Sequence, residues 1–309
     1  MARGEDRLVQ RIVVLIPAYN SAETISATLD SLATQREIQR LSRVYVADDA
    51  SSDGTVQLCR ACWKGPVPLH LWRAEHNLGQ QSNVNRALTA VQSDADWVLM
   101  LHADDMVKQG WLASLLHEID HADQRVASIC TSWDNLFADG SVEPGENDFQ
   151  GPTRVIHGTR QSVRNTLLSG CWWHISGCAI RTTAFADVGP FDESMPYMAD
   201  WDWLLRCLEH GWSISYVPRS FVLYRLHERS VAAVSLLADL DISESLRIAG
   251  RYAGLLSVRD VAQFHGRRAS FALRRMLRAL QRRQPSRLRG ELTTLASIGQ
   301  NMRGCLRAQ

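Results

Sequence analysis

The 309-residue sequence lacks several features that would assign it directly to a class. No apolar run approaches the roughly 20 residues that a membrane-spanning helix needs. Neither a GxGxxG fingerprint nor a GxxxxGK[ST] loop is present, so the two common glycine cradles for phosphate groups are excluded. The start does not resemble a signal peptide, because Met1–Arg11 is polar and charged and Ile12–Pro17 is too short for an apolar core.

Cysteine is scarce, and its pattern does not suggest disulfides. The seven cysteines form an odd and scattered set, which predicts reduced thiols and a cytoplasmic location. Cys59 and Cys62 make a CxxC within a helical pattern that has no second pair. Ordinary thiols are therefore favoured over a zinc or redox site.

Charge is unevenly distributed, although the net charge is only +1. Residues 240–309 hold fourteen arginines against four acidic residues, whereas residues 1–239 carry a net charge of −9. This shift predicts a boundary near residues 230–240. We expect one region over 1–230 and a basic helical extension over 231–309.

Three interpretations of the basic extension stay open. Leu273, Met276, Leu277 and Leu280 form an apolar stripe that the neighbouring arginines largely avoid. The stripe can pack on the core as a helical cap, or the helices can make a peripheral contact with an anionic membrane from the cytoplasmic side. Nucleic-acid binding is the third interpretation, and we expect no nucleic-acid partner because no recognised module is present.

Short apolar runs alternate with helical patterns along the first 130 residues. Ile12–Ile16, Val44–Ala47 and the run from Trp97 to Leu101 read as strands buried on both faces. Gln80–Val91 has the pattern of a helix between two of them. The alternation predicts an α/β fold with a Rossmann-like, mostly parallel sheet flanked by helices, followed by a C-terminal helical extension.

The second half of the chain is less regular. Trp133–Arg160 is rich in Gly, Asp, Asn and Pro, which predicts a long loop. Ala199–Glu209 reads as a helix, and Ser213–Val217 and Phe221–Leu226 read as two closing strands.

Polar residues follow the predicted strands at the positions Pro17–Asn20, Asp48–Asp53, Asn77–Gly79 and His102–Asp105. In open α/β sheets the strand ends converge on one edge, where ligand sites are built. Carboxylates accept the N–H groups of nucleotide bases, and two carboxylates with an imidazole can hold a divalent cation that binds a diphosphate. These residues predict a nucleotide-sugar site, with polar turns and helix caps as the alternative interpretation.

The ordered motifs PAYN, DDASSDGT, NLGQQSNVN, LHADD, FDE and ADWDWLLR resemble those of the family 2 glycosyltransferases, which have the GT-A fold. The resemblance covers about residues 10–230. It implies an inverting glycosyltransferase that uses Mn²⁺ or Mg²⁺ and a nucleotide-diphosphate sugar, with a UDP-sugar favoured. The implied acceptor is a hydroxyl of a saccharide or lipid-linked molecule in polysaccharide, glycolipid or other glycoconjugate synthesis.

The resemblance also implies roles for individual residues. The implied nucleotide-binding set is Pro17, Tyr19, Asn20, Asp48, Asp49, Asn77, Gly79 and Asp104. Asp104 falls on the metal-binding aspartate of the DxD element, and the segment YRLHERS adds His227 as a further ligand of the metal or diphosphate. Asp200 falls on the general base. Asp202 diverges from it on a helix, so we expect Asp202 to be solvated or ion-paired.

Two residues depart from the family pattern. His102 replaces the first aspartate of DxD, and Ala199 replaces the glutamate before the base. An imidazole ligand favours Mn²⁺ over Mg²⁺, while the alternative is that His102 binds no metal. These departures motivate a second functional hypothesis, a catalytically impaired nucleotide-sugar-binding protein of the same fold.

Three tryptophans are candidates for binding the acceptor, because aromatic faces stack on sugars. They are Trp172, Trp173 and Trp201. Core packing explains their presence equally well.

Overall fold

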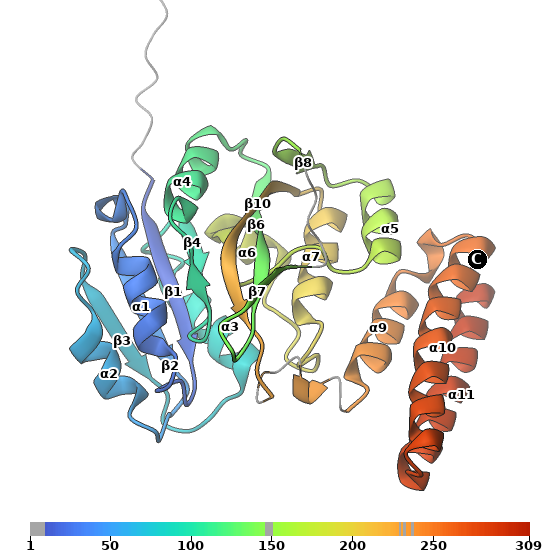
Figure 1. Cartoon of the computed structure of the whole chain (residues 1–309). Coiled ribbons are helices and arrows are strands. Elements are labelled where there is room, and N and C mark those ends of the chain that lie inside the picture. The colour runs from blue at the N-terminus through green and yellow to red at the C-terminus, as the bar shows by residue number, and fades with distance from the viewer. Residues whose placement is uncertain (1–9, 146–150, 229, 231–232, 236–237) are drawn as a thin grey trace, which may run out of the picture.

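A mixed β-sheet organises the chain (Figure 1). The computed structural model describes residues 10–145, 151–228, 230, 233–235 and 238–309. The sheet order is β3-β2-β1-β4-β9-β6-β10-β5, with β7 beside β6 and β8 beside β10. The strands are β1 (Ile12–Ala18), β2 (Arg43–Asp48), β3 (Leu69–Arg73), β4 (Trp97–Met100), β5 (Met106–Val107), β6 (Val126–Leu136), β7 (Val142–Pro144), β8 (Arg154–Ile156), β9 (Ala179–Arg181) and β10 (Ser213–Arg225).

Helices cover both faces of this sheet. The helices are α1 (Ile25–Ala33), α2 (Thr55–Cys62), α3 (Gln80–Val91), α4 (Trp111–His121), α5 (Arg160–Ser169), α6 (Thr182–Val188), α7 (Ala199–Glu209), α9 (Leu240–Arg251), α10 (Val258–Gln281) and α11 (Pro285–Arg307), with short 3-10 helices η1 (Ile38–Arg40) and η2 (Ala253–Leu255). Apolar residues of α1, α2 and α4 join one hydrophobic cluster, and those of α3, α5, α6 and α7 join the other. The predicted α/β fold with a helical C-terminal extension is confirmed.

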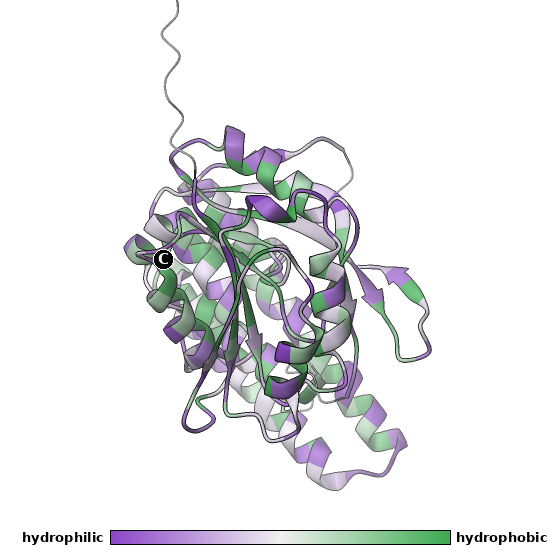
Figure 2. Cartoon of the chain, turned by 90° about the vertical axis from the view of Figure 1, so that its left-hand side faces the viewer, coloured by the Kyte–Doolittle hydropathy of each residue, from purple (hydrophilic) through white to green (hydrophobic). Residues whose placement is uncertain are grey.

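Strand periodicity explains why there are two clusters. Val13 and Leu15 of β1 belong to the cluster on the α3 side, while Val14 and Ile16 belong to the cluster on the α1 side. Successive side chains of a strand point to opposite faces, so a strand that is apolar at every position must be covered twice. All four residues of β4 are buried, as predicted. Figure 2 shows the hydrophobic strands enclosed by more hydrophilic helices and loops.

The pairing changes along the sheet. β1 pairs in parallel with β2 and β4, and β2 pairs in parallel with β3. Beyond β4 the sheet is mixed, because β9 pairs antiparallel with both β4 and β6, whereas β6 and β10 are parallel. The parallel part brings the carboxyl ends of β1, β2 and β4 to one edge, where the predicted site residues follow them.

The second half differs from prediction in two places. The two strands predicted at Ser213–Val217 and Phe221–Leu226 form one strand, β10, with register shifts around Ser220 where Pro218 cannot donate a backbone hydrogen bond. The loop predicted over Trp133–Arg160 instead contains the end of β6 together with β7 and β8, and part of it lies outside the described residues.

The C-terminal helices pack on the rest of the chain, but not through the predicted leucine stripe. Leu273, Leu277 and Leu280 are 43%, 55% and 52% exposed, which contradicts the interpretation in which this stripe packs on the core. The buried side of α10 instead carries residues such as Phe264 and Ala272. α10 and α11 lie side by side at one end of the molecule (Figure 1). Of the helices in the described ranges, none combines the length and hydropathy needed to cross a bilayer.

Candidate active site

The carboxyl ends of β1 and β2 form the first part of the site. Pro17 is near the end of β1, and Tyr19 follows it with half of its surface exposed. Asn20 joins the two strand ends, because its N–H donates to Ser51 Oγ at 2.9 Å and its Oδ1 accepts from Ser52 N at 2.9 Å. The predicted residues of PAYN and DDASSDGT therefore lie together.

Asp49 ties the end of β2 to the loop before α3. Its Oδ1 accepts from Leu78 N at 2.8 Å and its Oδ2 accepts from Gly79 N at 2.9 Å. Asn77 Oδ1 accepts from the same Gly79 N–H at 2.9 Å. The carboxylate is only 2% exposed, so both of its oxygens are satisfied by backbone groups inside the fold.

Asp48 is fully buried beside it. Its Oδ2 accepts from Ser51 N at 3.1 Å and lies 3.5 Å from Arg73 Nε. Its Oδ1 has no hydrogen-bond partner among the residues that the structure describes. A buried carboxylate oxygen of this kind is suited to accept an N–H group from a bound molecule.

A cluster of His102, Asp104 and Asp105 follows β4, and one side-chain ligand atom of each lies within 4.8 Å of the others. Within the described ranges, His102 Nε2 and Asp105 Oδ2 are buried atoms that lack a partner. Burial and the nearby charge of Asp104 raise the pKa of Asp105, while burial lowers the pKa of His102. A neutral imidazole beside carboxylates is a donor set that fits a divalent cation.

The end of β10 holds this cluster from the other side. Arg225 N donates to Asp105 Oδ1 at 3.0 Å, and Arg225 Nε donates to the backbone oxygen of Asp104 at 2.9 Å. His227 Nε2 lies 3.0 Å from Asp104 Oδ2. Although burial opposes the change, the His227 hydrogen bond and the adjacent imidazoles lower the pKa of Asp104. The structure thus brings His227 to the cluster.

A glycine lets another loop approach the cluster closely. Ser176 Oγ accepts from His102 N at 3.0 Å, and the next residue, Gly177, has a φ of +87°. A Cβ on Gly177 would lie 2.1 Å from Val222 Cγ2. Any side chain at position 177 would therefore displace the loop that supports His102.

Asp200 lies in the first turn of α7. Its Oδ1 accepts from Trp201 N at 2.7 Å, and burial raises its pKa to about 7. Burial and then the charges of Asp105, Asp104 and Asp200 raise the pKa of Tyr224. The side chain of Tyr224 therefore lies within electrostatic reach of both the acidic cluster and Asp200.

An aromatic wall beside the site was not predicted as a unit. Trp133 stacks on His174 with ring centroids 4.9 Å apart, and His174 meets the edge of Tyr224 at 5.0 Å. Burial lowers the pKa of His174 to about 4, so this imidazole is neutral at pH 7. Tyr224 stood within the quoted segment YRLHERS, but nothing in the sequence linked Trp133 to it.

The three tryptophans considered for acceptor binding are core residues. Trp172, Trp173 and Trp201 are 7%, 2% and 1% exposed. Trp173 Nε1 donates to the buried Ser128 Oγ at 2.9 Å, and Trp172 Nε1 donates to Thr166 Oγ1 at 3.2 Å. The structure favours the packing interpretation over the acceptor interpretation, because these rings present little surface to a sugar.

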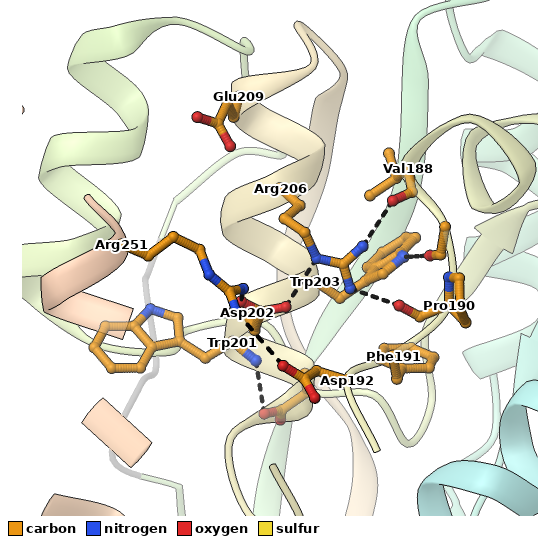
Figure 3. A network of polar contacts seen from close by, with 12 residues as sticks. Val188, Pro190, Phe191, Asp192, Trp201, Asp202, Trp203, Arg206, Glu209 and Arg251 are labelled. Carbon is orange, nitrogen blue, oxygen red and sulfur yellow. Dashed lines mark hydrogen bonds and ion pairs between the residues drawn. The ribbon is translucent and has the colours of Figure 1, made fainter. Parts of the chain in front are cut away.

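Asp202 belongs to a buried ion-pair network rather than to the site (Figure 3). It is fully buried and pairs with Arg206, at 2.8 Å, and with Arg251 of α9. Arg206 also donates to the backbone oxygens of Val188 and Pro190. The expectation that Asp202 is ion-paired is confirmed.

Comparison with known proteins points to one family. The sequence model of the family described as Glycosyl transferase family 2 matches residues 13–182, more than half of the chain. That range contains the strand ends of β1, β2 and β4 and the cluster after β4.

Curated relatives carry glycosyltransferase names. The chain is 36% identical over 126 residues to the uncharacterized glycosyltransferase YfnE of Bacillus subtilis, covering 40% of this chain and 31% of that protein. It is 23% identical to the glycosyltransferase AglE of Haloferax volcanii, covering 66% and 64%. It is 27% identical to the N-acetylglucosaminyl-diphospho-decaprenol L-rhamnosyltransferase of Mycobacterium tuberculosis, covering 72% and 78%. The chain thus spans less than two thirds of the first two proteins.

Solved structures share the fold. The crystal structure of S. aureus TarS 1–349 in complex with UDP-GlcNAc superposes with a TM-score of 0.60 at 17% identity, covering 94% of this chain and 92% of that one. TarS 1–349 in complex with UDP gives a TM-score of 0.59 at 19% identity, covering 94% and 91%. The expected GT-A fold is confirmed by these likenesses.

Proposed function

Because this chain belongs to glycosyl transferase family 2, we propose that it moves a sugar from a nucleotide-diphosphate sugar to an acceptor hydroxyl, with inversion at the anomeric carbon. One observation carries the proposal. The cluster of His102, Asp104 and Asp105 follows β4, and the charges of Asp105, Asp104 and Asp200 all act on the phenol of Tyr224. The cluster suits the diphosphate of a donor, and Asp200 suits removal of the acceptor proton.

We assign the donor to the strand ends of β1, β2 and β4. The proposed nucleotide-binding residues are Pro17, Tyr19, Asn20, Asp48, Asp49, Asn77, Gly79 and Asp104. The unpartnered oxygen of Asp48 within the described structure supports base recognition at this edge. Because TarS structures hold UDP-GlcNAc and UDP, a UDP-sugar is the donor that we favour.

We propose that Asp104, His102 and His227 hold a divalent cation and that Asp105 joins them. The fit rests on His102 Nε2 and Asp105 Oδ2, two buried atoms that have no partner in the described part of the chain. An imidazole among the ligands favours Mn²⁺, with Mg²⁺ as the alternative. A bound cation would stabilise the negative charge that develops on the leaving diphosphate.

Asp200 acts as the general base in this proposal. The acceptor oxygen forms a bond to the anomeric carbon, the bond from that carbon to the diphosphate oxygen breaks, and the acceptor proton passes to Asp200. A pKa of about 7 leaves much of this carboxyl group ionised at neutral pH while keeping it basic enough to accept the proton.

We further propose that the α10–α11 hairpin contacts an anionic membrane and brings the site to a saccharide or lipid-linked acceptor. The hairpin exposes large apolar side chains, among them Phe271, Leu273, Leu277, Leu280 and Leu292. Arginines 274, 278, 282, 283, 287 and 289 lie on the same two helices and their connection. Arginine near an anionic surface contributes about 1 kcal/mol of binding free energy per residue. The decaprenol-linked name of the mycobacterial relative supports a lipid-linked acceptor.

Vesicle flotation tests this contact. We expect the protein to float with phosphatidylglycerol vesicles and not with phosphatidylcholine vesicles, and Leu277→Asp to abolish flotation. Val142→Asp is the matched control, because Val142 is 47% exposed but lies on β7, away from the hairpin. Equal flotation of all three proteins would contradict the proposal.

A thermal-shift titration tests the main function. UDP, GDP, dTDP and CDP are added with Mn²⁺, Mg²⁺ or EDTA. We expect UDP with Mn²⁺ to raise the Tm, because a ligand at a hundredfold excess over Kd stabilises the folded state by about 2.7 kcal/mol. No response to any of the four nucleotides would contradict the proposal.

The alternative function is a nucleotide-sugar-binding protein that has lost turnover. His102 and Ala199 motivate it, because both depart from the family pattern. Nucleotide binding without transfer or hydrolysis of any donor would favour this alternative. In either case we propose residues 1–230 as the nucleotide-sugar region and residues 231–309 as its extension.

A further inference from the structure

Helix α9 of the extension contacts the segment that carries Asp200. Glu244 Oε2 accepts from Met198 N at 2.7 Å and from Tyr197 N at 3.1 Å. Met198 is the N-cap residue of α7 and Tyr197 precedes it, so these N–H groups have no acceptor within the helix. Glu244 is only 3% exposed, so this contact is made inside the protein. A carboxylate from a different helix therefore caps the helix that bears Asp200.

Two arginines on the same side of α9 extend this contact. Arg247 donates to Ser194 O at 2.9 Å and to Ser194 Oγ at 3.0 Å. Arg251 pairs with Asp192, at 3.5 Å, and with Asp202 (Figure 3). Glu244, Arg247 and Arg251 are three and four residues apart, the spacing of one helix face. This face holds the chain on both sides of Asp200.

We infer that Glu244 is a positioning residue for Asp200, so that the extension forms part of the catalytic machinery. The inference rests on the proposed role of Asp200 as the base. Position 199, directly before Asp200, is an alanine where the family pattern has a glutamate. In this chain a carboxylate near Asp200 is supplied instead by Glu244 of α9. The N–H contacts fix where α7 begins, and thereby the direction in which Asp200 points.

Glu244 also acts on Asp200 through its charge. Asp200 interacts with one carboxyl group, two thiols and two phenols, which belong to Glu244, Cys171, Cys178, Tyr197 and Tyr224. The thiols and phenols are neutral at pH 7, because burial raises their pKa values, that of Tyr197 to about 12. The charge of Glu244 is thus the one in this set that raises the pKa of Asp200 further.

Two substitutions in the full chain separate the cap from the charge. Glu244→Gln keeps an acceptor oxygen for the two N–H groups but removes the charge, so the acid limb of the kcat profile should move to lower pH by roughly 0.5 unit. Glu244→Ala removes both, and kcat should fall about tenfold with the donor KM unchanged. Asp260→Asn is the matched control, because Asp260 is a buried carboxylate that ties the extension to Arg164 of α5.

Hydrogen exchange of the backbone supplies a readout that does not require turnover. Peptides covering residues 197–204 should exchange faster in Glu244→Ala than in wild type or Asp260→Asn. A pH profile of Glu244→Gln that overlays wild type, together with unchanged exchange in Glu244→Ala, would overturn the inference. If Glu244→Ala does not fold, the pH profile of Glu244→Gln decides the inference, and a profile that overlays wild type overturns it. A wild-type protein without turnover would count against the proposed function, and the exchange data would still decide the role of Glu244.

Discussion

Asp49 and Asp105 are both buried carboxylates at strand ends, yet their surroundings are opposite. Both oxygens of Asp49 accept backbone N–H groups, from Leu78 and Gly79. Asp105 receives one backbone N–H, from Arg225, and its other oxygen has no partner in the described structure. The carboxylate of Asp49 is therefore satisfied within the protein, whereas the edge after β4 is open, because Asp105 has capacity left for a ligand.

The difference has an energetic meaning. A buried polar group without a partner destabilises the folded state by about 1–3 kcal/mol. Asp49 does not destabilise the fold in this way, because both of its oxygens have partners. Asp105 Oδ2 and His102 Nε2 do, because they have no partner among the described residues. We interpret Asp49 as a residue that supports the structure of the site. We interpret Asp105 and His102 as residues that are available to bind a ligand. Substitutions on the two edges should consequently affect different measurements.

Asp200→Asn is expected to have the largest effect. Asparagine has nearly the same shape but cannot accept the acceptor proton, so transfer should fall about 10²–10⁴-fold. UDP affinity should stay unchanged, because Asp200 is not among the proposed nucleotide residues. Transfer assays and isothermal titration with UDP measure the two quantities. Unchanged transfer would exclude Asp200 as the base.

Asp104→Asn tests the capacity of the open edge for a cation. The substitution removes a negative charge from the cluster, so the affinity for Mn²⁺ should fall by at least about tenfold. The Mn²⁺-dependent rise in Tm with UDP should disappear, and EDTA should have the same effect on wild type. Asp120→Asn is a suitable control, since Asp120 forms a surface pair with Arg40. Loss of the Mn²⁺ response in the control as well would contradict the assignment.

Asp49→Asn tests the contribution of the satisfied Asp49 carboxylate to stability. Its new NH₂ group would face a backbone N–H of Leu78 or Gly79, so two donors would oppose each other. We expect the free energy of unfolding to fall by about 1–3 kcal/mol even without ligand. Chemical denaturation measures this loss, and weaker UDP binding should accompany it. An unchanged stability would show that these two N–H contacts do not support the loop.

The pH dependence of stability tests the raised pKa of Asp200. Burial raises the pKa of Asp200 from 3.8 to about 7, so its protonated form is favoured in the folded state. The stability that this group contributes is present below its ordinary pKa and is lost as the pH rises through about 7. Transfer should rise over the same interval, because it needs the ionised base.

A comparison of Tm values of wild type and Asp200→Asn from pH 4 to pH 8 tests whether stability falls as Asp200 ionises. Asp200→Asn should match wild type at low pH and exceed it at pH 8, with each 1 kcal/mol worth roughly 2–4 °C. Parallel Tm curves would contradict the raised pKa. A Tm difference that grows toward low pH would also contradict it, because the raised pKa predicts a difference that grows toward high pH.

Local sequence patterns were sufficient to predict many of the helices and strands. α3 and α7 have the predicted bounds, and β1, β2 and β4 lie where the apolar runs indicated. The ordered motifs also placed Asp104 and His227 in one site, although 123 residues separate them. Strands and helices can be predicted in this way because periodicity depends on near neighbours in the chain, whereas the pairing of Asp104 with His227 was implied by the family resemblance.

The sequence did not predict which elements that are distant in the chain pack against each other. Amphipathic spacing in α10 indicated an apolar face but not what covers it, and Phe264 and Ala272 are buried where the leucine stripe was expected. The contacts of Glu244 with the start of α7 join residues 46 and 47 apart through a tertiary surface. No local signal in either segment specifies the other.

The order of the site along the chain has a consequence for biosynthesis. The strand ends of β1 and β2 are translated early, whereas Arg225 and His227 complete the cluster after β4, and Glu244 follows later. Domains fold during synthesis from the N-terminal end, at about 5–20 residues per second. A nascent chain thus contains the residues of β1, β2 and β4 several seconds before Glu244 is available to contact the start of α7. Stalling or premature release near residue 230 would yield a product that lacks α9 and therefore the Glu244 contacts at the start of α7.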